Sequence, residues 1–132
     1  MDLTQTRVRY DDADYRWLGS QHGTEATRSV TIDVTELNAS THYPNGYLPS
    51  GTPLGVLNGS DLYGVYDGTD PDTLTGFLLE PIKINPDSDT AAGALLEHGR
   101  VIEAFLPFEI DADGIADVAG RIIVIEADGG GS

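Results

Sequence analysis

The sequence of 132 residues contains no cysteine, and Lys83 is its only lysine. Without cysteine the chain can form neither disulfides nor a thiolate metal site, so its fold must be stabilised by packing or by association. No apolar run approaches the roughly 18 residues that a membrane-spanning helix needs, which excludes a membrane span. The N-terminal residues are polar and lack the apolar core of a signal peptide, so we expect the chain to be made in the cytoplasm.

Basic residues are scarce throughout, and this restricts the possible partners. Lys and Arg together number 7 against 22 Asp and Glu, which gives a formal net charge of −15. A nucleic-acid partner requires clustered cations that neutralise phosphates, and this sequence has no such cluster. The acidic excess instead favours solubility, which suits a protein made in many copies.

The charges divide the chain into two unequal parts. Residues 1–28 hold four of the seven cations against five acids, whereas residues 29–132 hold three cations against seventeen acids. The first part has few aliphatic residues and no sustained periodicity, so we interpret residues 1–28 as an N-terminal arm that packs poorly on its own domain. The alternative is an ordinary frayed terminus, but Trp17 is the kind of large aromatic that needs a surface to bury it.

The rest of the chain is typical of a mainly β domain with short strands. Val30, Ile32 and Val34 alternate with polar residues, which predicts a strand over residues 29–37 that packs on its own domain. A turn-rich stretch follows at residues 38–53. Further short apolar segments bounded by Gly, Asp or Pro predict additional strands at residues 54–57, 62–66 and 76–80.

The C-terminal half mixes strand and helix signals. Residues 91–106 have competing helix and strand patterns, and we predict mainly strand because Gly93 and Gly99 disfavour a helix. Residues 111–119 predict a short helix or turn, and the β-branched residues 121–126 predict a buried strand. The domain therefore spans residues 29–127 with one or two short helices, and residues 128–132 form a flexible Gly/Ser tail.

Motifs for catalysis or for cofactor binding are missing or incomplete. The three histidines, His22, His42 and His98, have no Ser and Asp partners in a recognisable order, and no phosphate-binding glycine loop occurs. Residues 109–120 resemble a calcium loop in their acidic positions, but the twelfth position is Gly120 where a bidentate Glu is required. We therefore expect no cofactor and no metal, and we expect that the protein is not an enzyme.

An ordered set of motifs gives a more specific indication. The motifs are His42-Tyr-Pro-Asn-Gly-Tyr-Leu-Pro-Ser-Gly-Thr-Pro-Leu-Gly55, Val65-Tyr-Asp-Gly68, Gly76-Phe-Leu-Leu-Glu80, Ala94-Leu-Leu-Glu-His-Gly-Arg-Val101, Leu106-Pro107 and Arg121-Ile-Ile-Val-Ile125. In this order and spacing they resemble the head decoration proteins of tailed bacteriophages, the family of the lambda capsid-stabilising protein. The resemblance covers about residues 29–127.

The resemblance implies a β-clip-like fold and a function as a capsid cement. Members of the family look like homotrimers on the outer surface of the expanded capsid, at its three-fold positions. They join neighbouring copies of the major capsid protein, and their N-terminal arm becomes ordered as it joins a capsid strand. Three linked arms would attach each trimer by avidity rather than by chemistry.

Two sets of residues are candidates for these contacts. The predicted capsid-binding residues of the arm are Arg7, Arg9, Arg16, Trp17 and Arg28. The predicted trimer contacts are Tyr43, Tyr47, Leu95, Val101 and Phe105. Two other functions stay open: a monomeric β-sandwich module that binds carbohydrate or a cell surface, and a small calcium-dependent enzyme.

Overall fold

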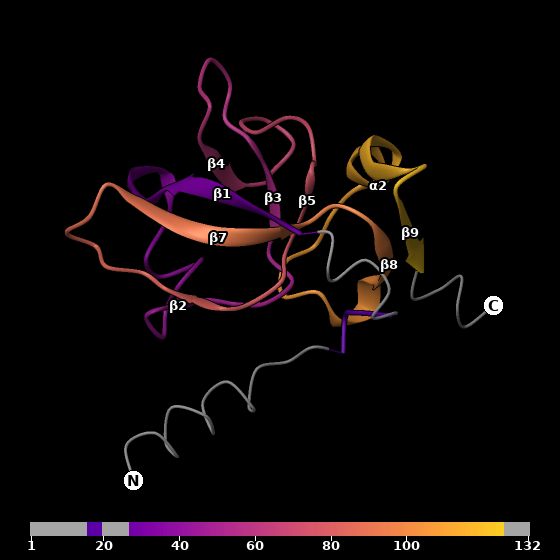
Figure 1. Ribbon diagram of the computed structural model, residues 1–132, viewed down its shortest axis with the longest axis horizontal. Coiled ribbons are helices and arrows are strands. Elements are labelled where there is room, and N and C mark those ends of the chain that lie inside the picture. Colours follow the sequence, from indigo (N-terminus) through magenta and orange to yellow (C-terminus); the bar gives the residue numbers. More distant parts are fainter. Residues whose placement is uncertain (1–15, 20–26, 126–132) are drawn as a thin grey trace, which may run out of the picture.

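The computed structural model describes residues 16–19 and 27–125 (Figure 1). Within these ranges the chain is mainly β, which confirms the predicted fold class. In chain order the elements are β1 (Arg28–Asp33), η2 (Val34–Glu36), β2 (Tyr47–Leu48), β3 (Pro53–Val56), β4 (Tyr63–Val65), β5 (Gly76–Leu78), β6 (Ile82–Lys83), β7 (Thr90–Leu96), β8 (Gly99–Ile102), η3 (Glu103–Phe105), α2 (Ala112–Val118) and β9 (Ile122–Ile125). Most of the predicted arm and the Gly/Ser tail lie outside the described residues.

Five strands close into a small barrel in the order β1, β4, β3, β5, β7. β1 and β7 form its longest pairing, antiparallel from Arg28 opposite Leu95 to Asp33 opposite Thr90, and they lie side by side in Figure 1. A parallel pairing of Ile32 with Tyr63 joins β1 to β4 and completes the closure. Closure gives each of these strands a neighbour on both sides, although β1 meets β4 at this one pair only.

The alternation in β1 places its apolar residues inside the barrel, as the sequence predicts. Val30, Ile32 and Val34 are buried in one core cluster together with Leu54 and Leu95. The strand ends earlier than predicted because the carboxylate of Asp33 accepts a hydrogen bond from the Thr35 backbone N–H at 3.0 Å. That capping bond turns the chain into the 3-10 helix η2.

A second, smaller sheet lies beside the barrel. β8 pairs in parallel with β9, from Gly99 opposite Ile122 to Ile102 opposite Ile125. Residues 17–19 occupy the other edge of β8, where Leu18 forms an antiparallel bridge with Val101. The result is a three-stranded arrangement of residues 17–19, β8 and β9, and it covers a second core cluster.

Two short strands were not expected from the turn-rich sequence around them. β2 and β6 pair as a separate two-stranded ribbon, with Tyr47 opposite Lys83. The predicted strand at residues 91–106 divides into β7, β8 and η3, and Gly99 adopts a left-handed backbone with φ of 133° at the division. The predicted strand at residues 121–126 forms, but it is buried on one face only, since Ile123 is 55% exposed.

The predicted helix or turn at residues 111–119 is the helix α2, which acidic side chains fix to the barrel. Asp111 caps the helix by accepting the Gly114 backbone N–H at 2.8 Å, and it also accepts the Tyr66 hydroxyl at 2.7 Å. Asp117 accepts the backbone N–H of Leu74 at 2.9 Å. Burial and the bond to Asp111 raise the pKa of Tyr66 well above its ordinary value, while the bonds from Tyr66 and Gly114 lower the pKa of Asp111.

These shifts predict a stability limit at high pH. A tyrosine with a raised pKa in the folded state contributes stability below pH 10, and this contribution is lost as the pH rises above 10. Tyr66→Phe should therefore have a lower free energy of unfolding than the native chain at pH 7. The difference between the two chains should shrink steadily above pH 10. Urea unfolding of both chains between pH 7 and pH 12 measures this difference.

Asp111→Asn is the matched control, because the amide keeps an oxygen that can cap α2. Its lowered folded pKa means that Asp111 contributes stability that is lost as the pH falls below about 4. The Asn variant should remove the loss of stability that Asp111 causes at low pH. It should also reduce, without abolishing, the loss above pH 10, because burial remains while the charge of Asp111 no longer helps to raise the pKa of Tyr66. A deficit of Tyr66→Phe that stays constant from pH 7 to pH 12 would contradict the assignment.

Candidate interaction site at the arm root

Residues 16–19 fasten the N-terminal part of the chain to the domain, and we call them the arm root. The Ile102 backbone N–H donates to the Trp17 carbonyl at 2.6 Å, and the Gly19 N–H donates to the Arg100 carbonyl at 3.0 Å. The Trp17 side chain is 0% exposed and lies in the second core cluster, with its ring centroid 5.9 Å from that of Phe77. The arm root is therefore part of the folded domain.

The Ser50-Gly51 turn is the seat of the Trp17 indole. The indole Nε1 donates to the Ser50 hydroxyl at 2.9 Å, and that hydroxyl donates in turn to the Leu79 carbonyl at 2.6 Å. Gly51 has a φ of 90°, and a Cβ there would lie 2.9 Å from the indole. Only glycine combines that left-handed backbone with room for the ring. The sequence identified this turn but gave no local signal that it receives Trp17.

Trp17 is accordingly a core residue, which corrects its predicted role as a hydrophobic capsid anchor. The prediction that residues 1–28 pack poorly on their own domain is wrong for the arm root and for Arg28, which lies in β1. The predicted capsid residues Arg7 and Arg9 lie outside the described residues. Their role stays a prediction.

The two other arginines of the predicted arm contact the domain itself. The guanidinium carbon of Arg16 lies 4.6 Å from the ring centroid of Phe105, a cation–π distance. Arg28 donates from Nε to Glu97 at 3.1 Å and from Nη2 to the Tyr63 hydroxyl at 2.8 Å. The bond to Glu97 and then the bond to Tyr63 raise the pKa of Arg28. Contacts within the fold thus already hold both arginines.

The predicted trimer contacts separate into interior and surface residues. Leu95 and Val101 are 0% exposed, so both fill the core, and their predicted place at a trimer contact is wrong. Phe105 is exposed beside the arm root, and Tyr43 and Tyr47 are half-buried. For these three aromatic residues the trimer contact stays a prediction.

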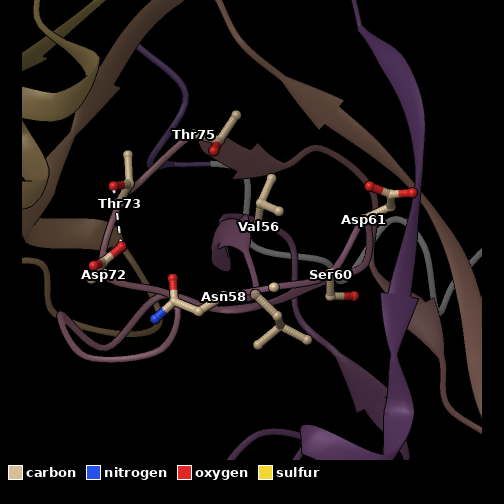
Figure 2. A pocket seen from close by; sticks show the side chains of 9 residues that line it. Val56, Asn58, Ser60, Asp61, Asp72, Thr73 and Thr75 are labelled. Atoms are coloured by element: carbon tan, nitrogen blue, oxygen red, sulfur yellow. Dashed lines mark hydrogen bonds between the residues drawn. The ribbon is translucent and has the colours of Figure 1, made fainter.

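A shallow hollow of about 600 Å³ lies next to the turn after β3, on the barrel. Figure 2 shows its polar side chains, with Asp61 and Asp72 on opposite sides and the Thr73 hydroxyl donating to Asp72 at 3.3 Å. Its lining residues include Val56 but no aromatic ring. Small-molecule sites are lined mainly by apolar and aromatic side chains, so this hollow gives little support to the carbohydrate-binding alternative.

Several acidic side chains in the described part of the chain hold elements of the fold together. Among residues 16–19 and 27–125, no group of three or more His, Asp or Glu side chains is placed to hold a metal ion. In the calcium-like motif, Asp111 and Asp117 instead bond to Tyr66, Gly114 and Leu74. No helix within these ranges is both long and apolar enough to cross a membrane.

Comparisons with known proteins leave the chain without an assigned family. No protein-family model matches the sequence, and no curated protein matches it. The function must therefore be argued from the arm root, from the surface of the domain and from the motif order.

The arm root predicts a sharp boundary for truncation. Deletion of residues 2–15 should leave the free energy of unfolding within about 0.5 kcal/mol of the native value, because it removes no described core contact. Trp17→Ala should cost about 3–5 kcal/mol through the cavity that it creates. Urea unfolding followed by far-ultraviolet circular dichroism measures both changes.

Ser50→Ala tests the hydrogen bond to the indole without changing the size of the Trp17 side chain. It leaves the buried indole N–H without its partner, which should cost about 1–3 kcal/mol. If Trp17→Ala unfolds at the same urea concentration as the native chain, then the arm root does not fasten the segment as described.

Proposed function

We propose that the protein is a capsid decoration protein that binds the outside of an expanded phage head as a homotrimer. In this function it joins neighbouring copies of the major capsid protein and stabilises the virion shell against the pressure of packaged DNA. Its N-terminal segment, residues 1–15, attaches each copy to the shell. The observation that carries the proposal is the fastening of the arm root into the core.

A segment that attaches a protein to a shell under pressure must transmit force to the folded domain. The arm root is suited to this, because Trp17 is fully buried and two backbone hydrogen bonds tie residues 17–19 to β8. Pulling on residues 1–15 would therefore load the core and the sheet rather than a loose connection. An ordinary frayed terminus would need neither a buried indole nor a hydrogen-bonded edge.

One motif of the ordered set that carries the family resemblance also forms the turn that receives Trp17. The string Ser50-Gly51-Thr52-Pro53-Leu54-Gly55 supplies the hydroxyl and the left-handed glycine that seat Trp17. The same string leads directly into β3 of the barrel. This link between the motif and the attachment segment favours the decoration function over a sugar-binding module.

The charge distribution supports placing the shell contact on residues 1–15. Since Arg16 and Arg28 contact their own domain, Arg7 and Arg9 are the cations left for a partner in the predicted arm. Residues 29–132 hold three cations against seventeen acids, so neighbouring trimers repel one another and stay evenly spread over a shell. Three copies around one axis would supply three such segments, and linked weak contacts give tight attachment.

The proposal predicts a thermal effect on empty expanded heads of the phage that encodes the chain. Saturating amounts of the native protein should raise the unfolding temperature of the heads, because binding to the folded shell stabilises it. The chain lacking residues 2–15 should remain folded and fail to raise that temperature. Scanning calorimetry of heads with each protein makes the measurement.

Matched charge variants locate the contact. Replacing Arg7 and Arg9 together by alanine should weaken binding to the heads by about tenfold or more, a loss of about 1.4 kcal/mol. Lys83→Ala, which removes an exposed cation on β6, should leave binding unchanged. The proposal is refuted if native protein at saturation leaves the melting of the heads unaltered.

A further inference from the structure

The outer edge of β9 is one of the strand edges that the described part of the domain leaves unpaired, and it is longer than those of the two-residue strands β2 and β6. β9 is the last strand of the three-stranded arrangement formed with residues 17–19 and β8, and Figure 1 shows it at the margin of the ribbon. Among the described residues, no strand pairs with the edge that faces away from β8. Natural edge strands are usually protected by a charge, a proline or a bulge, and the sequence Ile-Ile-Val-Ile has none of these.

The register of β8 and β9 determines which backbone groups point outward. The Gly99 N–H donates to the Arg121 carbonyl at 3.2 Å, and Gly99 lies opposite Ile122. In a parallel pair this places the hydrogen-bonding groups of residues 121 and 123 toward β8. The N–H and C=O groups of Ile122 and Val124 therefore point away from the sheet, ready to pair with another strand.

The side chains of β9 are apolar on the exposed face as well as on the buried face. Ile122 is in the second core cluster and Val124 packs against it, while Ile123 points to the opposite face and is 55% exposed. Ile123 is the most exposed of the large hydrophobic residues in the described part of the chain. An apolar strand with two donors and two acceptors that pair with no other described strand is suited to strand addition.

We infer that β9 pairs with β9 of a second copy of this chain, antiparallel about a two-fold axis. In the register that uses all four outward groups, Ile122 pairs with Val124 of the second copy and Val124 with its Ile122. This register places the two Ile123 residues directly opposite each other. They form a non-hydrogen-bonded pair with Cα atoms about 4.5 Å apart, and each buries the exposed side chain of the other.

Local charge favours a second copy as the occupant. Two of the three cations in residues 29–132 are at this sheet, Arg100 on β8 and Arg121 immediately before β9. The Arg121 guanidinium is held there by the carbonyls of Thr75 and Glu97 at 2.9 and 3.0 Å. These cations offset acidic charge near this edge, so two copies with a net charge of −15 repel each other less here than across a purely acidic surface.

The chain's own N-terminal segment is the other occupant that the test has to distinguish. To pair beyond β9, the segment would have to cross from the far edge of the sheet, about 14 Å at the usual strand spacing. Residues 1–15 are long enough for that path, since fifteen extended residues span up to about 50 Å. If a second copy is the occupant, thiols placed on β9 react without any deletion of this segment.

The small size of the contact makes the pairing weak. Two four-residue strands bury far less than the roughly 1,000 Å² of a stable interface, so the pair is weak in dilute solution. Its population should rise with salt, which screens the repulsion between two acidic molecules. The contact is two-fold and separate from any three-fold contact, so this inference goes beyond the proposed function and does not rest on it.

Disulfide trapping tests the pairing, because the chain has no cysteine of its own. Ile123→Cys places two thiols across the axis at a Cα separation that suits a disulfide. In a glutathione redox buffer its dimer should form at least roughly tenfold faster than that of Val56→Cys, since pairing raises the effective concentration of the thiols. The Ile123→Cys rate should also rise between about 20 mM and about 500 mM salt.

Val56 is the matched control, because it is 38% exposed but lies on β3, which is paired on both sides within the barrel. A second variant adds Val124→Pro to Ile123→Cys. Proline removes one outward N–H while the bonds of β9 to β8 remain, so the dimer rate should fall to that of Val56→Cys. Thermal unfolding of the double variant verifies that it is folded.

Three results would overturn the inference. One is a dimer rate for Ile123→Cys no higher than that of Val56→Cys at either salt concentration. Another is a high rate that a folded Val124→Pro double variant retains, which would indicate a collision patch instead of strand pairing. The third is reactivity that appears only after deletion of residues 2–15, which would make the N-terminal segment the occupant. None of these measurements uses phage heads, so the two proposals fail independently.

Discussion

The burial of Trp17 is the contact on which the rest of the arrangement depends. It joins the arm root to the turn before β3 and to Phe77 on β5, so one indole connects three segments that are far apart in the sequence. With Trp17 in place, residues 17–19 add to β8, and the small sheet covers the second core cluster. A chain without disulfides obtains its cross-links in this way, by side chains that tie distant elements together.

The same principle explains how the acidic residues are used. Asp111 and Asp117 hold α2 against the barrel, and Glu97 holds Arg28 at the start of β1. Each of these carboxylates accepts a hydrogen bond from another part of the chain, so part of the acidic excess contributes to the fold and not to solubility alone. The calcium-like appearance of residues 109–120 follows from this, because Asp111 caps α2 and Asp117 bonds to Leu74, and both fall at acidic positions of the motif.

Local patterns in the sequence predicted local structure well. The alternation of Val30, Ile32 and Val34 gave β1 and its buried face, and the β-branched run near the C-terminus gave β9. The environment of Trp17 could not be predicted, because its partner Ser50 is 33 residues away and residues 1–28 have no periodic pattern. Leu95 and Val101 failed as surface candidates for a related reason, since an apolar residue in a strand has the same pattern whether it faces a core or a partner.

The arm root also determines what the intrinsic fluorescence of this protein reports. Trp17 is the only tryptophan in the chain, and it lies where the N-terminal segment meets the domain. Its emission wavelength therefore reports the polarity of that junction and of no other place. The fluorescence of an unlabelled sample therefore shows whether the segment and the domain are still joined.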